Sequence, residues 1–437
     1  MTNNNTLKNR IDVVKHYSED KFVGLKADGG DALVYFPLGY RLSETDEEIR
    51  SDILKLFGIL NEFKDTKEGS STEKKYEESH DVEFPINAYL EIIRYYLENG
   101  YYTEVESVYK TRERGKIDWS RTIKQQKPLL SLNNHKCTYF PVYTLFTTIQ
   151  STPNENKEIT RIHQHCVRIS FERVGWIFTS FMPPKAEGAF DEKRFLAILR
   201  TKLANTNNDN KKRLFQSMID IIESIDEDEH GNKFHFGTKS FENVWEGLID
   251  KAFGTENKRD YYHRAHWILS NGEIYTPSQP LQPDSIMCTN DSEENYCYFV
   301  LDAKYYRYGD SGSSEHLPQN SDINKQITYA ENIETNKEIN HRNIYNAFLI
   351  PFNMENEDKF HSDEPFVNIG EAVSQWRKNE KNYEHIQGIL VDTKFLMNSY
   401  RSKSTSNINK LAKFIEDAYK DNERLYERNK ERLRNEN

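Results

Sequence analysis

Features that mark secreted, membrane-spanning or nucleotide-hydrolysing proteins are scarce or missing in this chain. Only four of its 437 residues are cysteine, which is too few for the disulfide framework of a secreted protein and favours a reducing cytoplasm. No run of about 18 apolar residues occurs, so we expect no membrane-spanning helix and no membrane partner. The N-terminal stretch MTNNNTLKNR lacks the apolar core of a signal peptide. No G-x-x-x-x-G-K-S/T loop is present, so we do not expect this chain to hydrolyse GTP or ATP itself.

An excess of basic residues is missing as well. The chain carries 59 Lys and Arg against 70 Asp and Glu, a net charge of −11. This balance argues against a protein that coats nucleic acid along its whole surface, because such proteins neutralise phosphates with a basic excess. It leaves room for a local basic cleft or for a partner subunit that binds DNA. Apolar residues make up 36% of the chain and aromatic residues 13%, which predicts a folded, globular protein.

The chain is longer than the size at which one hydrophobic core stops growing, so we expect several domains. Its pattern of strands, helices and polar runs predicts an α/β fold of mixed α+β type. The first expected segment is a mixed β and helical N-terminal domain (1–150), and the second is a helical connecting region (151–236). A mixed domain with the candidate catalytic residues (237–402) and a charged C-terminal helix (403–437) follow. A β-hairpin is expected across 22–38, and two later strands at 344–350 and 386–391. Two charged stretches are expected to be loops, 65–81 and 226–233.

The run Tyr298–Tyr306 (YFVLDAKYY) places a carboxylate and an ammonium at the end of an apolar strand. Asp302 and Lys304 are two residues apart, so on a strand both side chains leave the same face. Burying such groups is costly unless they pair with each other or serve a function. A structural ion pair at a strand end and a catalytic site are therefore both open at this point.

A second acidic residue, Asp284, lies upstream in Pro283-Asp284, with 17 residues between it and Asp302. The intervening sequence TNDSEEN is typical of a turn, so 286–288 and 298–301 are expected to pair as a hairpin that brings Asp284 near Asp302. Two carboxylates and the backbone carbonyl of Ala303 would form the oxygen-rich site that Mg²⁺ prefers. Lys304 would then orient or deprotonate a metal-bound water and offset charge in the transition state.

This order of residues resembles the PD-(D/E)xK pattern of the restriction-endonuclease-like fold. The resemblance implies a glutamate that reaches the metal from the preceding helix, where Glu242 and Glu246 stand four apart; we choose Glu246, and Glu242 stays open as the alternative. It also implies a following helix that presents polar side chains to the active site. Gln326, with Tyr329 three residues later on the same helical face, fits that description. An ordinary amphipathic helix would show the same spacing.

The chain as a whole resembles the LlaJI-type restriction endonucleases, relatives of the McrC subunit of GTP-dependent McrBC-like systems. The pieces that carry this resemblance are 24–30, 35–40, 114–122, 241–246 and the PD…DAK site. The resemblance implies that the N-terminal half docks onto an AAA+ GTPase (McrB-like) ring. A local basic cluster falls in that half, at Arg112, Arg114, Lys116, Arg121, Lys124 and Lys127. It would track a DNA backbone or be a solvated face.

Two further patterns are set aside. His163 and Cys166, with His135 and Cys137 upstream, match the spacing of no common zinc module. Asp392 and Lys394 repeat the D-x-K form without a preceding PD hairpin, so we interpret them as a structural pair at a strand end.

Together these patterns predict a Mg²⁺-dependent endonuclease subunit of a restriction-modification system that cuts double-stranded DNA. The expected catalytic residues are Asp284, Asp302, Lys304, Glu246 and Gln326, and the expected metal ligands are Asp284, Asp302, Glu246 and the Ala303 carbonyl. Two alternatives remain: a stand-alone type II restriction enzyme, and a non-catalytic adaptor that activates a GTPase partner.

Overall fold

The computed structural model describes residues 7–14, 21–28, 32–63, 84–133, 138–154, 157–186, 188–226, 233–290, 296–337, 339–356 and 359–435. The loop expected at 65–81 lies outside the described residues, as do 227–232 of the second expected loop and 291–295 of the predicted turn. Among the described helices, none combines the length and apolar character needed to cross a bilayer.

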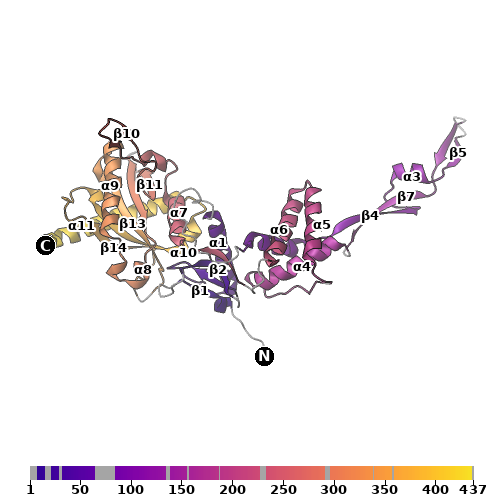
Figure 1. The fold of residues 1–437 in the computed structure, drawn as a ribbon, viewed down its shortest axis with the longest axis horizontal. Helices are drawn as coiled ribbons and strands as arrows, with labels where there is room; N and C mark the ends of the chain where they lie inside the picture. Colours follow the sequence, from indigo (N-terminus) through magenta and orange to yellow (C-terminus); the bar gives the residue numbers. More distant parts are fainter. Residues whose placement is uncertain are drawn as a thin grey trace, which may run out of the picture. The chain divides into compact units, whose positions relative to one another are not determined.

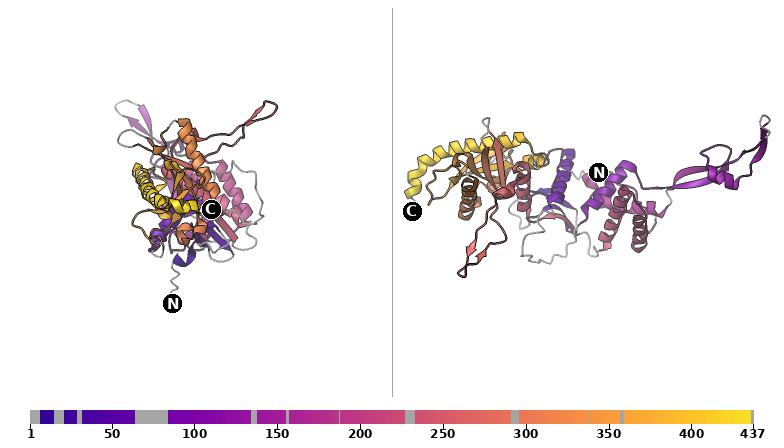
Figure 2. Two further views of the ribbon diagram at one scale, coloured as in Figure 1. Left: turned by 90° about the vertical axis from the view of Figure 1, so that its left-hand side faces the viewer. Right: turned by 90° about the horizontal axis from the view of Figure 1, so that it is seen from above.

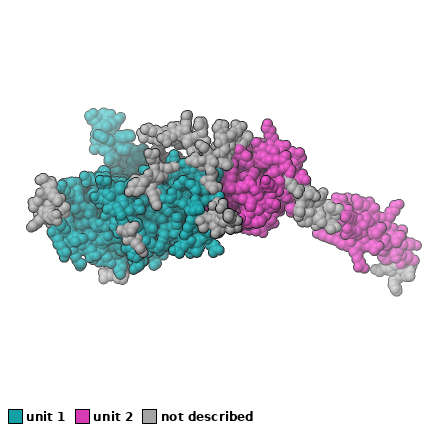
Figure 3. All heavy atoms as spheres, turned by 90° about the horizontal axis from the view of Figure 1, so that it is seen from below, with its two compact units in different colours: residues 1–81, 234–437 teal, residues 82–233 magenta. Residues whose placement is uncertain are grey.

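The chain divides into two compact units, coloured in Figure 3. The major unit consists of residues 1–81 and 234–437, and the inserted unit of residues 82–233. This division differs from the segments expected from sequence, in which residues 1–150 stood together. The difference arises because β8 (Lys233–Thr238) joins the sheet of the N-terminal strands and returns the chain to them.

The N-terminal sheet of the major unit has the order β1-β3-β2-β8, from β1 (Ile11–Val13), β2 (Val23–Asp28), β3 (Leu33–Phe36) and β8. The hairpin predicted in this region is confirmed, since β2 and β3 pair antiparallel. Helix α1 (Asp46–Phe63) follows, as its apolar stripe predicts. Strands β2 and β8 approach so closely that a Cβ on Gly237 would lie 2.1 Å from the carbonyl oxygen of Val23.

A second, five-stranded sheet forms the centre of the major unit (Figure 1). Its order is β11 (Ser285–Asn290), β12 (Tyr296–Ala303), β13 (Ile344–Phe352), β15 (His385–Asp392) and β14 (Phe366–Val373). The outer pairs β11–β12 and β14–β15 are antiparallel, and the inner pairs are parallel. The mixed α/β character, the β11–β12 hairpin and the two later strands are therefore confirmed. Buried parallel strands need apolar side chains on both faces, and β13 (IYNAFLIPF) supplies them.

Helices cover both faces of this sheet. Helix α9 (Asn320–Lys337) packs against one face, where Ile286, Val300 and Phe348 join Ile327 and Ala330 in one apolar cluster. Helix α7 (Phe241–Phe253) contacts α10 (Thr393–Ser399) and α11 (Thr405–Asn435), and all three helices contact strands of the sheet. Figure 2 shows the long α11 running along the sheet. The charged C-terminal helix is thus confirmed, and its first half owes its place to a buried apolar stripe.

The inserted unit is mainly helical. Helices α2 (Ile86–Asn99), α4 (Glu158–Arg173), α5 (Glu192–Ala204) and α6 (Asp209–Asp226) contact one another. Strands β4 (Glu104–Arg112) and β7 (Phe146–Asn154) pair antiparallel over nine residues. Between them the chain forms α3 (Trp119–Gln125) and the hairpin of β5 (Leu129–Asn133) and β6 (Thr138–Val142). We call the segment from β4 to β7 the arm.

Replacing Gly237 with alanine should destabilise the major unit, because the added Cβ would collide with the backbone of β2. We expect the free energy of unfolding to fall by about 1–3 kcal/mol, the usual cost of overpacking. Chemical denaturation of the full chain, followed by tryptophan fluorescence, measures this change. An unaltered transition midpoint would show that β2 and β8 separate without cost.

Candidate active site

The β11–β12 hairpin brings two carboxylates to one end of the central sheet. Ser285 and Leu301 are the last paired residues at this end of the hairpin. Asp284, which precedes Ser285, therefore lies opposite Asp302, which follows Leu301. The backbone N–H of Ala303 donates a hydrogen bond to Oδ2 of Asp284 at 3.0 Å. Asp302 is 2% exposed. The expected approach of Asp284 to Asp302 therefore follows from the register of the hairpin.

Lys304 is held between two carboxylates. Its Nζ lies 2.7 Å from Oδ2 of Asp302 and 3.0 Å from Oδ1 of Asp322, at the beginning of α9. Burial alone would lower the pKa of Lys304, but Asp302 and Asp322 reverse this effect and hold the pKa above its usual value. The side chain is therefore a fixed cation at neutral pH, and a protonated lysine cannot accept a proton from water.

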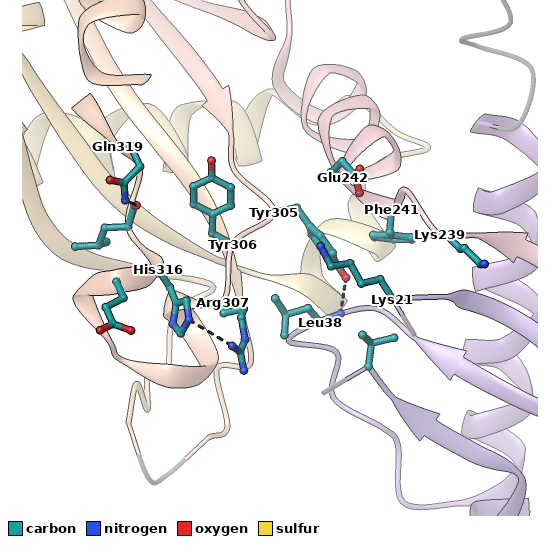
Figure 4. Close-up of a pocket in the computed structure, with 13 residues that line it drawn as sticks. Lys21, Leu38, Lys239, Phe241, Glu242, Tyr305, Tyr306, Arg307, His316 and Gln319 are labelled. Atoms are coloured by element: carbon teal, nitrogen blue, oxygen red, sulfur yellow. Dashed lines mark hydrogen bonds between the residues drawn. The ribbon is translucent and has the colours of Figure 1, made fainter. Parts of the chain in front are cut away.

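A third carboxylate acts on the same site from α7. Burial, then the charges of Asp302 and Glu246, raise the pKa of Asp284 to about 7, although the Ala303 N–H and Lys304 oppose the shift. The structure thus brings Glu246 close enough to influence Asp284. Glu242, one helical turn earlier, lines a different cavity of about 510 Å³ with Tyr305, Tyr306 and other residues (Figure 4). The two glutamates that sequence left as alternatives therefore face different surroundings.

The predicted Gln326 lies inside the core behind the carboxylates. It is buried, and its Nε2 donates to the carbonyl oxygen of Val300 at 2.7 Å. This bond ties α9 to β12 two residues before Asp302. Gln326 therefore positions the strand that carries Asp302, and among the described residues its side chain forms no hydrogen bond with Asp284 or Asp302.

Sequence reasoning passed over Lys325. Burial would lower the pKa of this lysine, but the hydroxyl of Tyr329 and the charges of Asp302 and Asp284 raise it. Its Nζ lies 5.5 Å from the centre of the Tyr329 ring. The signal was present in the sequence, since Lys325 and Tyr329 are four apart and share a helical face. Unlike the salt-bridged Lys304, Lys325 is only partly covered, and the residue keeps much of its surface exposed to solvent.

The donor set fits a hard divalent cation. Asp284, Asp302 and Glu246 offer only oxygen, and their mutual repulsion would be relieved by positive charge. Within the described ranges, no three acidic, histidine or cysteine side chains form a ready-made metal cage. This agrees with the geometry, because Asp302 turns toward Lys304 and Asp284 toward the Ala303 N–H. Mg²⁺ commonly takes one or two carboxylates together with waters and substrate phosphates, so it does not need a closed cage.

The two patterns set aside from sequence have structural roles. His163 is buried, its Nδ1 accepts from the N–H of Tyr102 at 3.0 Å, and burial lowers its pKa to about 3. The pairing predicted between Asp392 and Lys394 is wrong. Asp392 accepts from the N–H of Phe395 at 2.7 Å and caps α10, whereas Lys394 lies 2.9 Å from Asp52 of α1. The partner of Lys394 comes from a distant segment, which local spacing could not reveal.

Comparison with known proteins adds an independent finding. The model of the LlaJI restriction endonuclease family matches residues 22–374. The type II restriction enzyme BsuMI component YdjA of Bacillus subtilis (strain 168) is 27% identical over an alignment of 269 residues, which covers 58% of this chain and 55% of that protein. The aligned part thus spans about half the length of that relative. A refined half-complex of Thermococcus gammatolerans McrB AAA+ hexamers with bound McrC aligns with 14% identity and a TM-score of 0.33, over 90% of this chain and 84% of the matched chain.

Replacing Asp284 with asparagine should stabilise the metal-free chain at high pH. The folded state raises the pKa of Asp284 above its unfolded value, so the wild-type chain loses stability as the pH rises from about 4 to about 7. Asparagine removes this charge and can still accept the Ala303 hydrogen bond. In EDTA we expect a gain of roughly 2–4 kcal/mol near pH 8 and little change near pH 4. Denaturant titrations at both pH values measure it, and destabilisation at both would contradict the crowding of the three carboxylates.

Proposed function

The chain belongs to the LlaJI restriction endonuclease family, and from this premise we propose that it is the DNA-cutting subunit of a restriction system. Its site would be a Mg²⁺-dependent PD-(D/E)xK centre that hydrolyses phosphodiester bonds in double-stranded DNA. One observation carries this proposal. The β11–β12 register brings Asp284 and Asp302 to one end of the sheet, where Glu246 and Lys304 act on the same carboxylates.

The surroundings of each residue indicate its role in the proposed reaction. Asp284, Asp302 and Glu246, with the Ala303 carbonyl, would hold Mg²⁺, which when bound lowers the pKa of a coordinated water and offsets phosphate charge. Lys304 stays protonated, because Asp302 and Asp322 raise its pKa. Of the three roles considered for Lys304, orientation of the water and charge stabilisation are therefore favoured over proton abstraction. Lys325 would supply a second positive charge, on the α9 side of the carboxylates.

Substitution of the strand-end residues should abolish cleavage. We expect Asp302→Asn and Lys304→Ala each to lower the rate of Mg²⁺-dependent plasmid cleavage by about 100-fold or more, because charge stabilisation in such sites contributes at least that much. The assay uses the full chain together with any co-encoded subunits that cleavage requires. Undiminished cleavage by both folded variants would refute the assignment.

Glu246 and Glu242 provide a matched pair for the third ligand. Both are on α7, one turn apart, and the charge of Glu246 is among the main causes that raise the pKa of Asp284, whereas Glu242 lines the separate cavity beside Tyr305. We expect Glu246→Gln to reduce cleavage strongly and Glu242→Gln to have little effect. The reverse order would transfer the role to Glu242.

The arm supports a proposal about partners. Many large apolar side chains on it are exposed: Tyr109, Trp119, Ile123, Leu129, Leu130, Leu132, Tyr139, Phe140 and Leu145. Clustered exposure of this kind marks protein interaction sites. The family resemblance implies an AAA+ GTPase, and we propose that the arm docks onto such a McrB-like subunit. The basic residues of the arm, such as Arg114 and Lys124, are exposed as well, and they would help to orient an acidic partner or contact DNA.

Polar substitutions on the arm should separate docking from catalysis. We expect Leu130→Ser together with Tyr139→Ser to weaken binding of a co-encoded AAA+ GTPase by about tenfold or more, as loss of central apolar contacts does in other interfaces. Leu97→Ser is the control, because Leu97 is an exposed apolar residue of α2 outside the arm. Light scattering and titration calorimetry measure complex formation. Cleavage that needs no GTP and no partner would favour the stand-alone type II enzyme.

A further inference from the structure

A small hairpin stands out from the major unit just before the catalytic strands. Its strands β9 (Trp267–Ile268) and β10 (Ile274–Tyr275) pair antiparallel, and Figure 2 shows the hairpin extending away from the helices and sheets. The turn is well defined, since the N–H of Leu269 donates to Glu273 O at 2.8 Å and that of Gly272 to Leu269 O at 2.9 Å. Gly272 has a φ of +85°, which favours glycine.

The four strand residues of this hairpin are apolar or aromatic and expose most of their surface. The exposed fractions are 63% for Trp267, 79% for Ile268, 70% for Ile274 and 57% for Tyr275. Neighbouring residues of a strand point to opposite faces, so both faces of the hairpin are uncovered among the described residues. A flat protein surface would cover only one of them. The pattern therefore favours an occupant that surrounds the hairpin.

The hairpin begins at the edge of the candidate active site. Its base is closed by a bridge between His263 and Leu281, and Leu281 lies three residues before Asp284. The ring of His263 lies 6.2 Å from that of Tyr329, whose hydroxyl interacts with Lys325. A substrate bound at Asp284 and Asp302 would consequently lie next to this hairpin.

The charge of the hairpin region suits a polyanion better than the chain as a whole does. Residues 257–281 contain Lys258, Arg259 and Arg264 against Asp260 and Glu273, so the segment is close to balanced in a chain of net charge −11. Lys258 pairs with Asp250 at 2.9 Å, whereas Arg259 and Arg264 are exposed and would be the residues that contact phosphates. The basic residues lie toward the base of the hairpin and the apolar ones in its strands. Phosphate contacts beside exposed apolar side chains are the arrangement by which proteins insert a wedge into a duplex.

We propose that the β9–β10 hairpin is a wedge that enters the DNA duplex beside the cleaved bond and separates neighbouring base pairs. Trp267 and Tyr275 would stack on bases, and Ile268 and Ile274 would fill the opened step. A two-stranded ribbon is narrow enough to enter the major groove, whose width is about 12 Å. Aromatic side chains stack on any base, so the wedge would not require a particular sequence. This inference rests on the proposed function, because it takes DNA as the substrate.

Binding to two short duplexes tests the wedge without any need for a recognition sequence. One duplex is fully paired. The other contains one identical strand, but its second strand is mismatched in the centre, so that a bubble of unpaired bases forms there. The protein is the full-length Asp302→Asn chain in Mg²⁺, so that cleavage does not consume the probe, and fluorescence anisotropy gives the affinity. Because unstacking is already complete in the bubble, we expect about tenfold tighter binding to it than to the paired duplex.

Two substitutions in β9, Trp267→Ala and Ile268→Ala, are combined in one protein that we call the tip variant. They should remove this preference, so that both duplexes bind equally. Trp376→Ala is the matched control, since Trp376 is a 71% exposed tryptophan elsewhere in the major unit, and it should keep the preference. A 2-aminopurine placed in the paired duplex reports unstacking, and its fluorescence should rise with the Asp302→Asn chain but not with the tip variant.

Each other outcome is informative. The wedge is wrong if the Asp302→Asn chain with Trp267 and Ile268 intact binds both duplexes equally. It is also wrong if the preference for the bubble survives in the tip variant. Both outcomes leave the nuclease proposal intact. A chain that binds neither duplex contradicts DNA as the substrate and with it the proposed function. If the tip substitutions change only the oligomeric mass in light scattering, or only binding of a protein partner, the hairpin is a protein contact and the wedge is wrong.

Discussion

Concentrated negative charge at the end of a buried strand is the constraint around which the major unit is arranged. Asp284 and Asp302 lie opposite each other at the end of one hairpin, and the negative charge of Glu246 on α7 acts on Asp284. Such a cluster opposes folding unless cations or hydrogen-bond donors compensate it. The chain supplies Lys304 as a bridge to Asp322 and the Ala303 N–H as a donor. The compensation remains incomplete, because the pKa of Asp284 is still raised to about 7.

The surrounding elements hold this cluster in position. Trp245 of α7 is buried, and its Nε1 donates to the carbonyl of Leu349 at 3.2 Å, which fixes that helix on the sheet. Gln326 does the same for α9 through Val300. The N-terminal sheet also contributes, since the N–H of Leu38 donates to the hydroxyl of Tyr305, directly after Lys304, at 2.6 Å. Residues far apart in the chain thus converge on the end of β12.

Two parts of the chain depart from the usual burial of apolar side chains, and they do so in different units. The arm of the inserted unit exposes a large number of them, and the β9–β10 hairpin of the major unit exposes four on two faces. Elsewhere in the major unit, side chains of the same kind fill the core, as Phe299 and Phe348 do. The proposed division of labour, with a partner on the arm and DNA at the hairpin, follows from this contrast.

Local patterns in the sequence were sufficient for much of the major unit. Alternating and continuous apolar runs predicted β11, β12, β13 and β15, and the turn between Asp284 and Asp302 predicted the pairing that brings them together, because register and turn are short-range properties. Long-range packing determined the rest. It joined β8 to the N-terminal strands, paired Lys394 with Asp52, turned Glu246 rather than Glu242 toward Asp284, buried Gln326 and placed Lys325 beside the carboxylates. Spacing along a chain shows which side chains share a face, whereas the neighbours of that face depend on which distant elements pack against it.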